Sequence, residues 1–176
     1  MKNVILVGMP GSGKSTLGIL LSKKIHYGYI DSDSVIVAGA GKLLPDLIAE
    51  LGNEGFLALE ARVNASLDVR SCVISTGGSA IYRGDVIEKM KKNGVVVYLR
   101  ISYEEMAKRL GDYKRRGVVL QEGFTLRDLY EERAPLYEQH ADYILSLDGE
   151  SVEESADKLA ELLGDTIREE DYAGII

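Results

Sequence analysis

The segment Gly8-Met9-Pro10-Gly11-Ser12-Gly13-Lys14-Ser15 constrains the fold more than any other part of the sequence. It matches the phosphate-loop pattern G-x-x-x-x-G-K-[ST] at every fixed position. The apolar run 4–7 before it is typical of a buried parallel strand, and apolar residues at helical spacing follow it over 16–24. The segment therefore predicts a strand, a loop that surrounds phosphate groups, and a helix.

The residue types of this loop suit the chemistry of a nucleotide. Glycines let successive backbone N–H groups point at a phosphate chain, and the start of the helix adds the positive end of its dipole. We expect Lys14 to reach the β- and γ-phosphates of ATP and the Ser15 hydroxyl to ligate Mg²⁺. An ordinary glycine-rich turn is the alternative, which the flanking strand and helix disfavour. The predicted ATP-binding residues of the loop are Gly11, Ser12, Gly13, Lys14, Ser15 and Thr16.

Composition limits the class of protein. A chain of 176 residues without an internal linker predicts a single domain over 1–163, followed by a tail over 164–176. A net charge of −7 argues against a general electrostatic grip on nucleic acid or an anionic membrane, and no apolar run is long enough to cross a bilayer. The single cysteine, Cys72, cannot form an internal disulfide. We expect a cytoplasmic monomer without a nucleic-acid or membrane partner.

Strand-like and helix-like segments alternate along the chain, which predicts an α/β layered fold with a mostly parallel sheet. The expected strands are 4–7, 29–31, 72–75, 95–99 and 143–145. The expected helices are 15–25, 33–37, 44–51, 56–69, 85–92, 103–110, 126–140 and 152–163.

The segment 111–123 does not fit this alternation. It contains three glycines and three consecutive cations at 114–116, with little periodicity. Loops of this length inside a compact domain are usually functional, and phosphoryl transfer needs water excluded. We interpret the segment as a basic lid that closes over the phosphates; a plain surface loop is the alternative.

Two carboxylates, Asp31 and Asp33, follow the second expected strand. Residues two apart on an extended chain face the same side, so both are expected to point into the crevice at the carboxyl edge of the sheet. Asp31 suits a Mg²⁺ site beside Ser15, and Asp33 suits an acceptor hydroxyl that it orients and deprotonates. The alternative is that these residues only cap the next helix.

Two further motifs contain candidate ligand-binding residues. Thr76-Gly77-Gly78-Ser79 follows the third strand, where paired glycines permit backbone to approach a ligand and Thr76 can hold a metal-bound water; a simple turn is the alternative. Arg133 can grip an acid group bidentately, or else form an exposed ion pair with nearby glutamates. Pro135 is expected to kink this helix or start a new one.

The order of these motifs resembles the shikimate kinases, a family within the nucleoside-monophosphate-kinase-like group, over roughly residues 1–163. The resemblance rests on the phosphate loop, on Asp31-x-Asp33, on Gly52-Asn53-Glu54-Gly55-Phe56 with Glu60, on Thr76-Gly77-Gly78, and on Arg133-x-Pro-Leu-Tyr with Ala141-Asp142.

The resemblance implies a five-stranded parallel sheet of order 2-3-1-4-5 with helices on both faces and a lid. It implies an ATP-dependent kinase that transfers the γ-phosphoryl group to a hydroxyl of shikimate with Mg²⁺, and so a role in aromatic amino acid biosynthesis. By resemblance, Lys14, Asp33 and the lid residue Arg116 are catalytic, and Arg116 also contacts the ATP phosphates. The acceptor site would comprise Asp33, Gly77, Gly78, Ser79 and Arg133, and the metal ligands would be Ser15 and Asp31.

Three motifs depart from the family pattern. Phe-Arg-x-x-Glu becomes Phe56-Leu57-Ala58-Leu59-Glu60, which removes one of two arginines that grip the carboxylate of shikimate in the family. Ser79 interrupts a glycine triplet, and the lid reads Arg116-Gly-Val-Val in place of Arg-Pro-Leu-Leu. We therefore expect intact ATP handling but weak use of shikimate, unless Arg83 replaces the missing arginine. A related hydroxy acid or polyol and an inactive nucleotide-binding relative are the alternatives.

Overall fold

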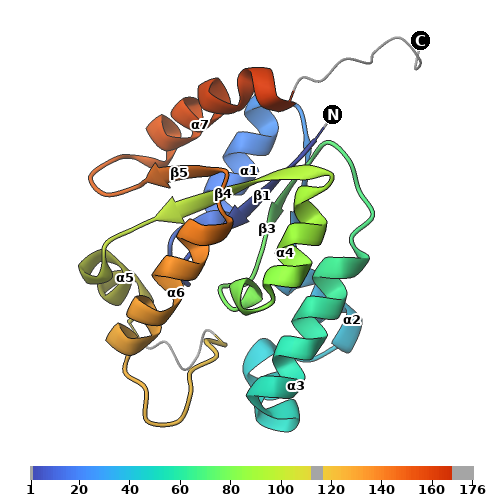
Figure 1. Ribbon diagram of the computed structural model, residues 1–176, viewed down its shortest axis with the longest axis vertical. Helices are drawn as coiled ribbons and strands as arrows, with labels where there is room; N and C mark the ends of the chain where they lie inside the picture. Colours follow the sequence, from blue (N-terminus) through green and yellow to red (C-terminus); the bar gives the residue numbers. More distant parts are fainter. Residues whose placement is uncertain (1, 112–116, 168–176) are drawn as a thin grey trace.

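A five-stranded parallel sheet forms the centre of the computed structural model, which describes residues 2–111 and 117–167 (Figure 1). The strands are β1 (Asn3–Val7), β2 (Gly28–Asp31), β3 (Cys72–Ser75), β4 (Gly94–Arg100) and β5 (Tyr143–Ser146). Their order is β2-β3-β1-β4-β5, with Val4 of β1 paired to Val73 on one side and Val95 on the other. The predicted sheet and its order are confirmed, and each expected strand ends within one residue of the observed one.

Helices cover both faces of this sheet (Figure 1). Helices α1 and α7 lie together on one face, whereas α4 and α6 lie on the other. Their bounds, with those of the remaining helices, are α1 (Lys14–Lys24), α2 (Ser32–Ala40), α3 (Leu44–Ser66), α4 (Gly84–Lys91), α5 (Tyr103–Leu110), α6 (Leu126–His140) and α7 (Val152–Ile167), with a 3₁₀ turn at Ala80–Tyr82.

The core explains why the sheet can hold a ligand site rigidly. Strand β1 and the apolar residues of β4 are buried, and both helical layers pack on them. A second, smaller cluster joins α2, α3 and the described part of the expected lid through Ile36, Leu47, Phe56 and Val119. The phosphate loop therefore leaves the most buried strand, while the opposite wall of the crevice belongs to a separate apolar cluster.

Four helices differ from their expected forms. Helix α2 ends at Ala40, three residues beyond the expected end. The two helices expected at 44–51 and 56–69 form one element, α3, which is kinked at the left-handed Gly52 (φ 68°). Helix α7 extends to Ile167, four residues beyond the expected end. Helix α6 runs through Pro135 without interruption, so no new helix starts there, and the expected kink stays a prediction. Leu129 and Arg133 before the proline and Tyr137 after it are buried on the same helix, and this packing outweighs the one hydrogen bond that the proline forfeits.

Part of the expected lid is described. Residues 117–123 approach α3 and α6, where the Leu120 carbonyl accepts a hydrogen bond from Asn53 Nδ2 (3.0 Å) and the Val119 carbonyl accepts one from Arg133 Nη2 (2.8 Å). Residues 112–116, with Arg116, lie outside the described residues, as do residues 168–176 of the expected tail 164–176. The lid and the role of Arg116 therefore stay predictions.

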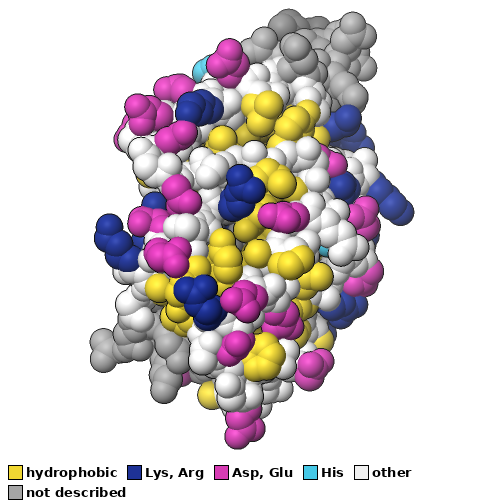
Figure 2. All heavy atoms as spheres, turned by 60° about the vertical axis from the view of Figure 1, so that its left-hand side comes forward, with side chains coloured by type: hydrophobic (Ala, Val, Ile, Leu, Met, Phe, Trp, Pro, Cys, Tyr) yellow, Lys and Arg dark blue, Asp and Glu magenta, His cyan; other side chains and the backbone are white. Residues whose placement is uncertain are grey.

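The surface is mixed in character. On the face that Figure 2 shows, acidic side chains are interspersed with lysines and arginines, and apolar side chains lie between them. Among the described residues, no helix is both long and apolar enough to cross a membrane.

Candidate functional site

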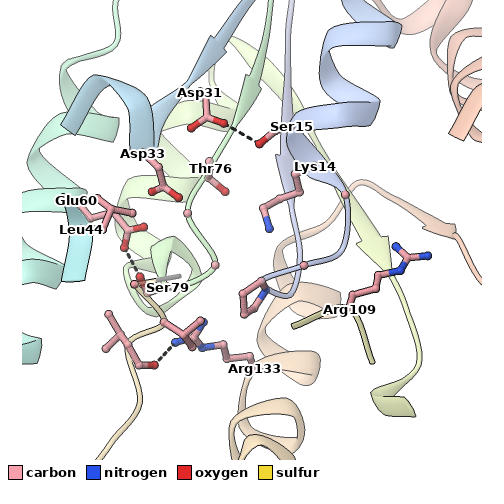
Figure 3. A pocket seen from close by; sticks show the side chains of 18 of the residues that line it. Lys14, Ser15, Asp31, Asp33, Leu44, Glu60, Thr76, Ser79, Arg109 and Arg133 are labelled. Atoms are coloured by element: carbon pink, nitrogen blue, oxygen red, sulfur yellow. Dashed lines mark hydrogen bonds between the residues drawn. The ribbon is translucent and has the colours of Figure 1, made fainter. Parts of the chain in front are cut away.

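A cavity of about 580 Å³ at the carboxyl edge of the sheet contains most of the predicted site residues (Figure 3). Lys14 and Ser15 lie on one side of it, and Asp31, Asp33 and Glu60 on the other (Figure 3). The predicted residues that line the cavity are Gly11, Gly13, Lys14, Ser15, Thr16, Asp31, Asp33, Gly77, Gly78, Ser79 and Arg133. Ser12 belongs to the loop but lies behind this lining, fully buried.

The phosphate loop leaves the start of α1 available for an anion. Gly13 is the N-cap in a left-handed conformation (φ 94°) that favours glycine, and no side chain caps this helix start. The buried Ser12 hydroxyl likewise has no hydrogen-bond partner among the described residues. Uncapped N–H groups and a free hydroxyl suit phosphate oxygens.

Lys14 holds the loop in shape from within. Its Nζ donates hydrogen bonds to the carbonyls of Gly8 (2.8 Å) and Met9 (2.9 Å), and the side chain is buried. Burial lowers the pKa of Lys14 to about 8, against the opposing attraction of Asp33. The ammonium group remains mostly charged at neutral pH, and a phosphate group arriving in the cavity would stabilise that charge.

Ser15 and Asp31 bring two oxygen ligands together. Ser15 Oγ donates to Asp31 Oδ2 at 2.7 Å, while Asp31 Oδ1 accepts from the backbone N–H of Ser34 at 3.1 Å and so caps α2. Asp31 therefore caps α2, as the alternative expected, while its other oxygen remains on Ser15; the metal role of Asp31 stays a prediction. The described residues hold no cluster of three or more His, Cys, Asp or Glu side chains that could hold a metal ion. This pair fits a hard cation whose remaining ligands are phosphate oxygens and water.

Asp33 reaches the cavity from a helix and not from an extended strand. It lies in the first turn of α2, so the expected reason for its pairing with Asp31 is wrong, although both side chains line the cavity. Burial, followed by repulsion from Asp31, raises the pKa of Asp33 to about 6. A carboxylate with this pKa is ionised at neutral pH yet basic enough to accept a proton from a reacting hydroxyl.

The two glycines after β3 lie in close contact with side chains of the cavity. A Cβ on Gly77 would lie 2.1 Å from Glu60 Oε1 and 2.7 Å from Asp33 Oδ1. A Cβ on Gly78 would lie 3.1 Å from Arg133 Nη1. The preceding Thr76 is buried and donates its hydroxyl to the Leu6 carbonyl at 3.0 Å. The backbone here lies close to acidic and basic side chains, and its expected approach to a ligand stays a prediction.

Arg133 is buried, which excludes the exposed ion pair that its neighbouring glutamates suggested. Its Nη2 donates to the Val119 carbonyl, its Nε donates to the Tyr82 hydroxyl at 3.1 Å, and the guanidinium lies 4.9 Å from the centre of the Tyr82 ring. These contacts hold a cation against the cavity wall, where it can pair with an acid group.

Sequence reasoning assigned no site role to Glu60 or Arg109, which both line the cavity. Glu60 is 1% exposed and accepts a hydrogen bond from Ser79 Oγ at 2.7 Å. Arg109 of α5 is held by Glu105 (2.6 Å) and lies 3.4 Å from the Ser12 carbonyl. The resemblance included Glu60 without giving it a role, and nothing in the spacing connected Arg109 to a loop 97 residues away.

Position 57 does not face the cavity. Leu57 lines a neighbouring hollow of about 520 Å³ together with Glu54, Glu122 and Glu132. Arg83, the candidate replacement for the missing arginine, lines the same hollow and is paired with Asp85 (3.0 Å) on the surface. Neither position supplies a cation to the main cavity in this conformation.

Comparison with known proteins gives a consistent result. A profile of the family described as shikimate kinase matches residues 10–164. The chain is 36% identical over 166 residues to the shikimate kinase of Alteromonas mediterranea, covering 93% of this chain and 97% of that protein. It is 32% identical over 162 residues to the shikimate kinase of Caldanaerobacter subterraneus, covering 90% and 94%.

Solved structures agree. A shikimate kinase from Acinetobacter baumannii in complex with shikimate superposes with a TM-score of 0.87 at 31% identity, covering 96% of each chain. The thymidylate kinase of Candida albicans, 14% identical with a TM-score of 0.64, shares the fold alone.

Proposed function

This chain belongs to the shikimate kinase family, and we propose that its cavity transfers the γ-phosphoryl group of ATP to a hydroxyl of shikimate, with Mg²⁺ as the metal. One observation carries the assignment of roles: the phosphate-loop lysine and the Asp33 carboxylate line the same cavity from opposite sides (Figure 3). The comparisons favour shikimate over a different acceptor and over an inactive relative.

The phosphate loop would bind the nucleotide. The N–H groups at the start of α1 and Lys14 would hold the β- and γ-phosphates, and Ser12, Gly13 and Thr16 would complete the cradle. Lys14 would neutralise charge on the transferring phosphoryl group. Its hydrogen bonds to the carbonyls of the loop hold its ammonium group beside the phosphate site, so the backbone need not rearrange when ATP binds. Arg109 borders the same loop, which places a second cation near the nucleotide.

Ser15 and Asp31 would hold Mg²⁺. When bound, such an ion would neutralise negative charge on the phosphates and orient them for in-line transfer. The Ser15 hydroxyl donates to Asp31, so these two oxygens already lie together and would both be available to a cation bound beside them. Family membership implies a divalent cation, and the all-oxygen ligand pair favours Mg²⁺.

Asp33 would act as the base toward the acceptor. As the acceptor oxygen forms its bond to the γ-phosphorus, the bond from that phosphorus to the β-γ bridging oxygen breaks, and the hydroxyl proton passes to Asp33. The raised pKa of Asp33, about 6, suits this task. Arg133 would pair with the carboxylate of shikimate, and Gly77, Gly78 and Ser79 would border the ring.

The lid completes the proposal. Its described part, 117–123, already contacts α3 and α6, and Val118 and Val119 line the cavity. We expect Arg116 to reach the phosphates when the lid closes. The proposed enzyme is a cytoplasmic monomer that takes ATP and shikimate and has no nucleic-acid or membrane partner. Light scattering tests the oligomeric state.

Coupled ADP release with shikimate tests the function, and mass spectrometry identifies the expected product, shikimate 3-phosphate. Release should require shikimate and Mg²⁺, and quinate in place of shikimate serves as a matched control for acceptor choice. ADP release without a phosphorylated acceptor would indicate an ATPase and contradict the proposal.

A further inference from the structure

The cavity contains a carboxylate that the phosphoryl transfer proposed above does not use. Glu60 is almost fully buried, and Ser79 Oγ donates to one of its oxygens, Oε2. The other oxygen, Oε1, has no hydrogen-bond partner among the described residues. A buried carboxylate oxygen without a donor is costly, which indicates that a donor arrives with a ligand.

The free oxygen faces the place where an acceptor hydroxyl is expected. Glu60 Oε1 and Asp33 Oδ1 both lie beside Gly77, 2.1 Å and 2.7 Å from the position that a Cβ would take there. The two oxygens can therefore be no further apart than the sum of these distances. Oxygens so placed can contact two hydroxyls carried by neighbouring carbons of one small ring.

The charged groups around Glu60 act on it without supplying a donor to Oε1. Asp33 of α2 opposes its ionisation, whereas Lys14 of α1 and Arg133 of α6 favour it from a distance. Neither cation forms an ion pair with Glu60: Lys14 is bonded to loop carbonyls, and Arg133 is bonded to Val119 and Tyr82. Among the described residues, the direct donor to Glu60 is Ser79, a residue that stands where the family pattern has glycine.

We propose that Ser79 is a positioning residue, which holds Glu60 so that Oε1 accepts a hydrogen bond from the acceptor hydroxyl adjacent to the one that Asp33 deprotonates. The cavity then selects an acceptor with two neighbouring hydroxyls. This inference rests on the proposed function, and for shikimate it assigns the 3-hydroxyl to Asp33 and the 4-hydroxyl to Glu60.

The protonation of Glu60 follows from the same contacts. Burial raises the pKa of Glu60 to about 7, and the hydrogen bond from Ser79 opposes that rise. Removal of the Ser79 hydroxyl should therefore raise this pKa further, and protonated Glu60 is a poorer acceptor for a hydroxyl. The KM for shikimate should fall as the pH rises through about 7 in the unmodified enzyme and only at higher pH in Ser79→Ala.

The experiment compares the unmodified enzyme with Ser79→Ala, Ser79→Thr and Glu60→Ala in steady-state kinetics across this pH range. Ser79→Ala should raise the KM for shikimate about tenfold at neutral pH, with the KM for ATP unchanged. Ser79→Thr keeps the hydroxyl and should restore the original pH profile. Ser66→Ala is a matched control, because it also removes a hydroxyl, from the same helix that carries Glu60. The Ser66 hydroxyl is exposed and donates to the Val63 carbonyl, away from Glu60.

Two deoxy analogues test the selectivity directly. The unmodified enzyme should use 4-deoxyshikimate roughly ten- to a hundredfold less efficiently than shikimate, whereas Glu60→Ala should discriminate little between them. The loss for 5-deoxyshikimate should be the same in both proteins, since that hydroxyl is not adjacent to the reacting one.

The outcomes separate the two proposals. If the unmodified enzyme phosphorylates shikimate but Ser79→Ala keeps both its KM and its pH profile, the role of Ser79 is overturned and the proposed function stands. If Glu60→Ala discriminates against 4-deoxyshikimate as strongly as the unmodified enzyme does, the contact between Glu60 and the 4-hydroxyl is overturned and the proposed function stands. If the unmodified enzyme neither binds shikimate in calorimetry nor phosphorylates it, both proposals fail.

Discussion

Asp33→Asn should stabilise the protein while it strongly lowers turnover. The folded protein binds a proton at Asp33 more tightly than the unfolded chain does, because burial raises the pKa of this carboxyl from 3.8 to about 6. A group whose pKa is raised in the folded state contributes its stability at low pH and loses it as the pH rises through the folded pKa. At neutral pH the ionised Asp33 therefore weakens the fold, and asparagine removes that penalty.

The size of the effect follows from the same pKa values. Each pKa unit corresponds to about 1.4 kcal/mol, so the rise at Asp33 corresponds to roughly 3 kcal/mol as an upper bound. Because Asp33 keeps some exposure to solvent, we expect Asp33→Asn to add about 1–3 kcal/mol to the free energy of unfolding at pH about 7.5. This corresponds to a rise in Tm of roughly 2–10 °C for a chain of this length. The gain should nearly vanish at pH about 4, where Asp33 is protonated in the folded protein.

Urea unfolding at pH about 7.5 and about 4 measures the change in stability, and coupled ADP release measures the change in turnover. Loss of the base should lower kcat by about 10²–10⁴. Asp128→Asn provides a control of opposite sign, because the hydrogen bonds from Thr125 lower the pKa of this exposed carboxyl and asparagine should destabilise the protein. If Asp33→Asn were less stable than the unmodified protein at neutral pH, or if its gain were the same at both pH values, the reasoning would be refuted.

Three other substitutions test separate parts of the molecule. Lys14→Ala should lower kcat by roughly 10²–10³ and weaken ATP binding in calorimetry, and activity like that of the unmodified enzyme would contradict the role of the loop. Leu57→Arg should change the KM for shikimate by less than about threefold, because the new guanidinium would enter the neighbouring hollow and pair with Glu54, Glu122 and Glu132. A tenfold fall in this KM would show that position 57 reaches the main cavity. Asn64→Leu should raise the free energy of unfolding by about 1–3 kcal/mol, because both polar atoms of this buried amide lack partners among the described residues; a lower Tm would mean that a bound water or ligand satisfies the amide.

Local patterns in the sequence were enough for the sheet and the nucleotide half of the site. The phosphate loop is a contiguous segment whose glycines and lysine act through their own backbone and their own helix, so its chemistry can be recognised without knowing the rest of the fold. Apolar runs likewise located β1, β3 and β4, since burial on both faces leaves a continuous apolar segment. The edge strands β2 and β5 are only partly buried, and the alternation of strand-like and helix-like segments located them. The strand order came from resemblance to a family, because periodicity alone does not specify which strands are neighbours.

The acceptor half of the site depends on packing between distant segments, and there the sequence was insufficient. Glu60 meets Ser79, and Arg133 meets Val119, only because α3, the turn after β3 and α6 pack around one cavity. Packing also decided that Leu57 faces a neighbouring hollow, that α6 continues through Pro135, and that Asp33 projects from a helix. The raised pKa values of Asp33 and Glu60 follow from burial by residues far away in the chain. A sequence lists the charged groups, but only the tertiary structure decides how much water each of them loses and which charges it faces.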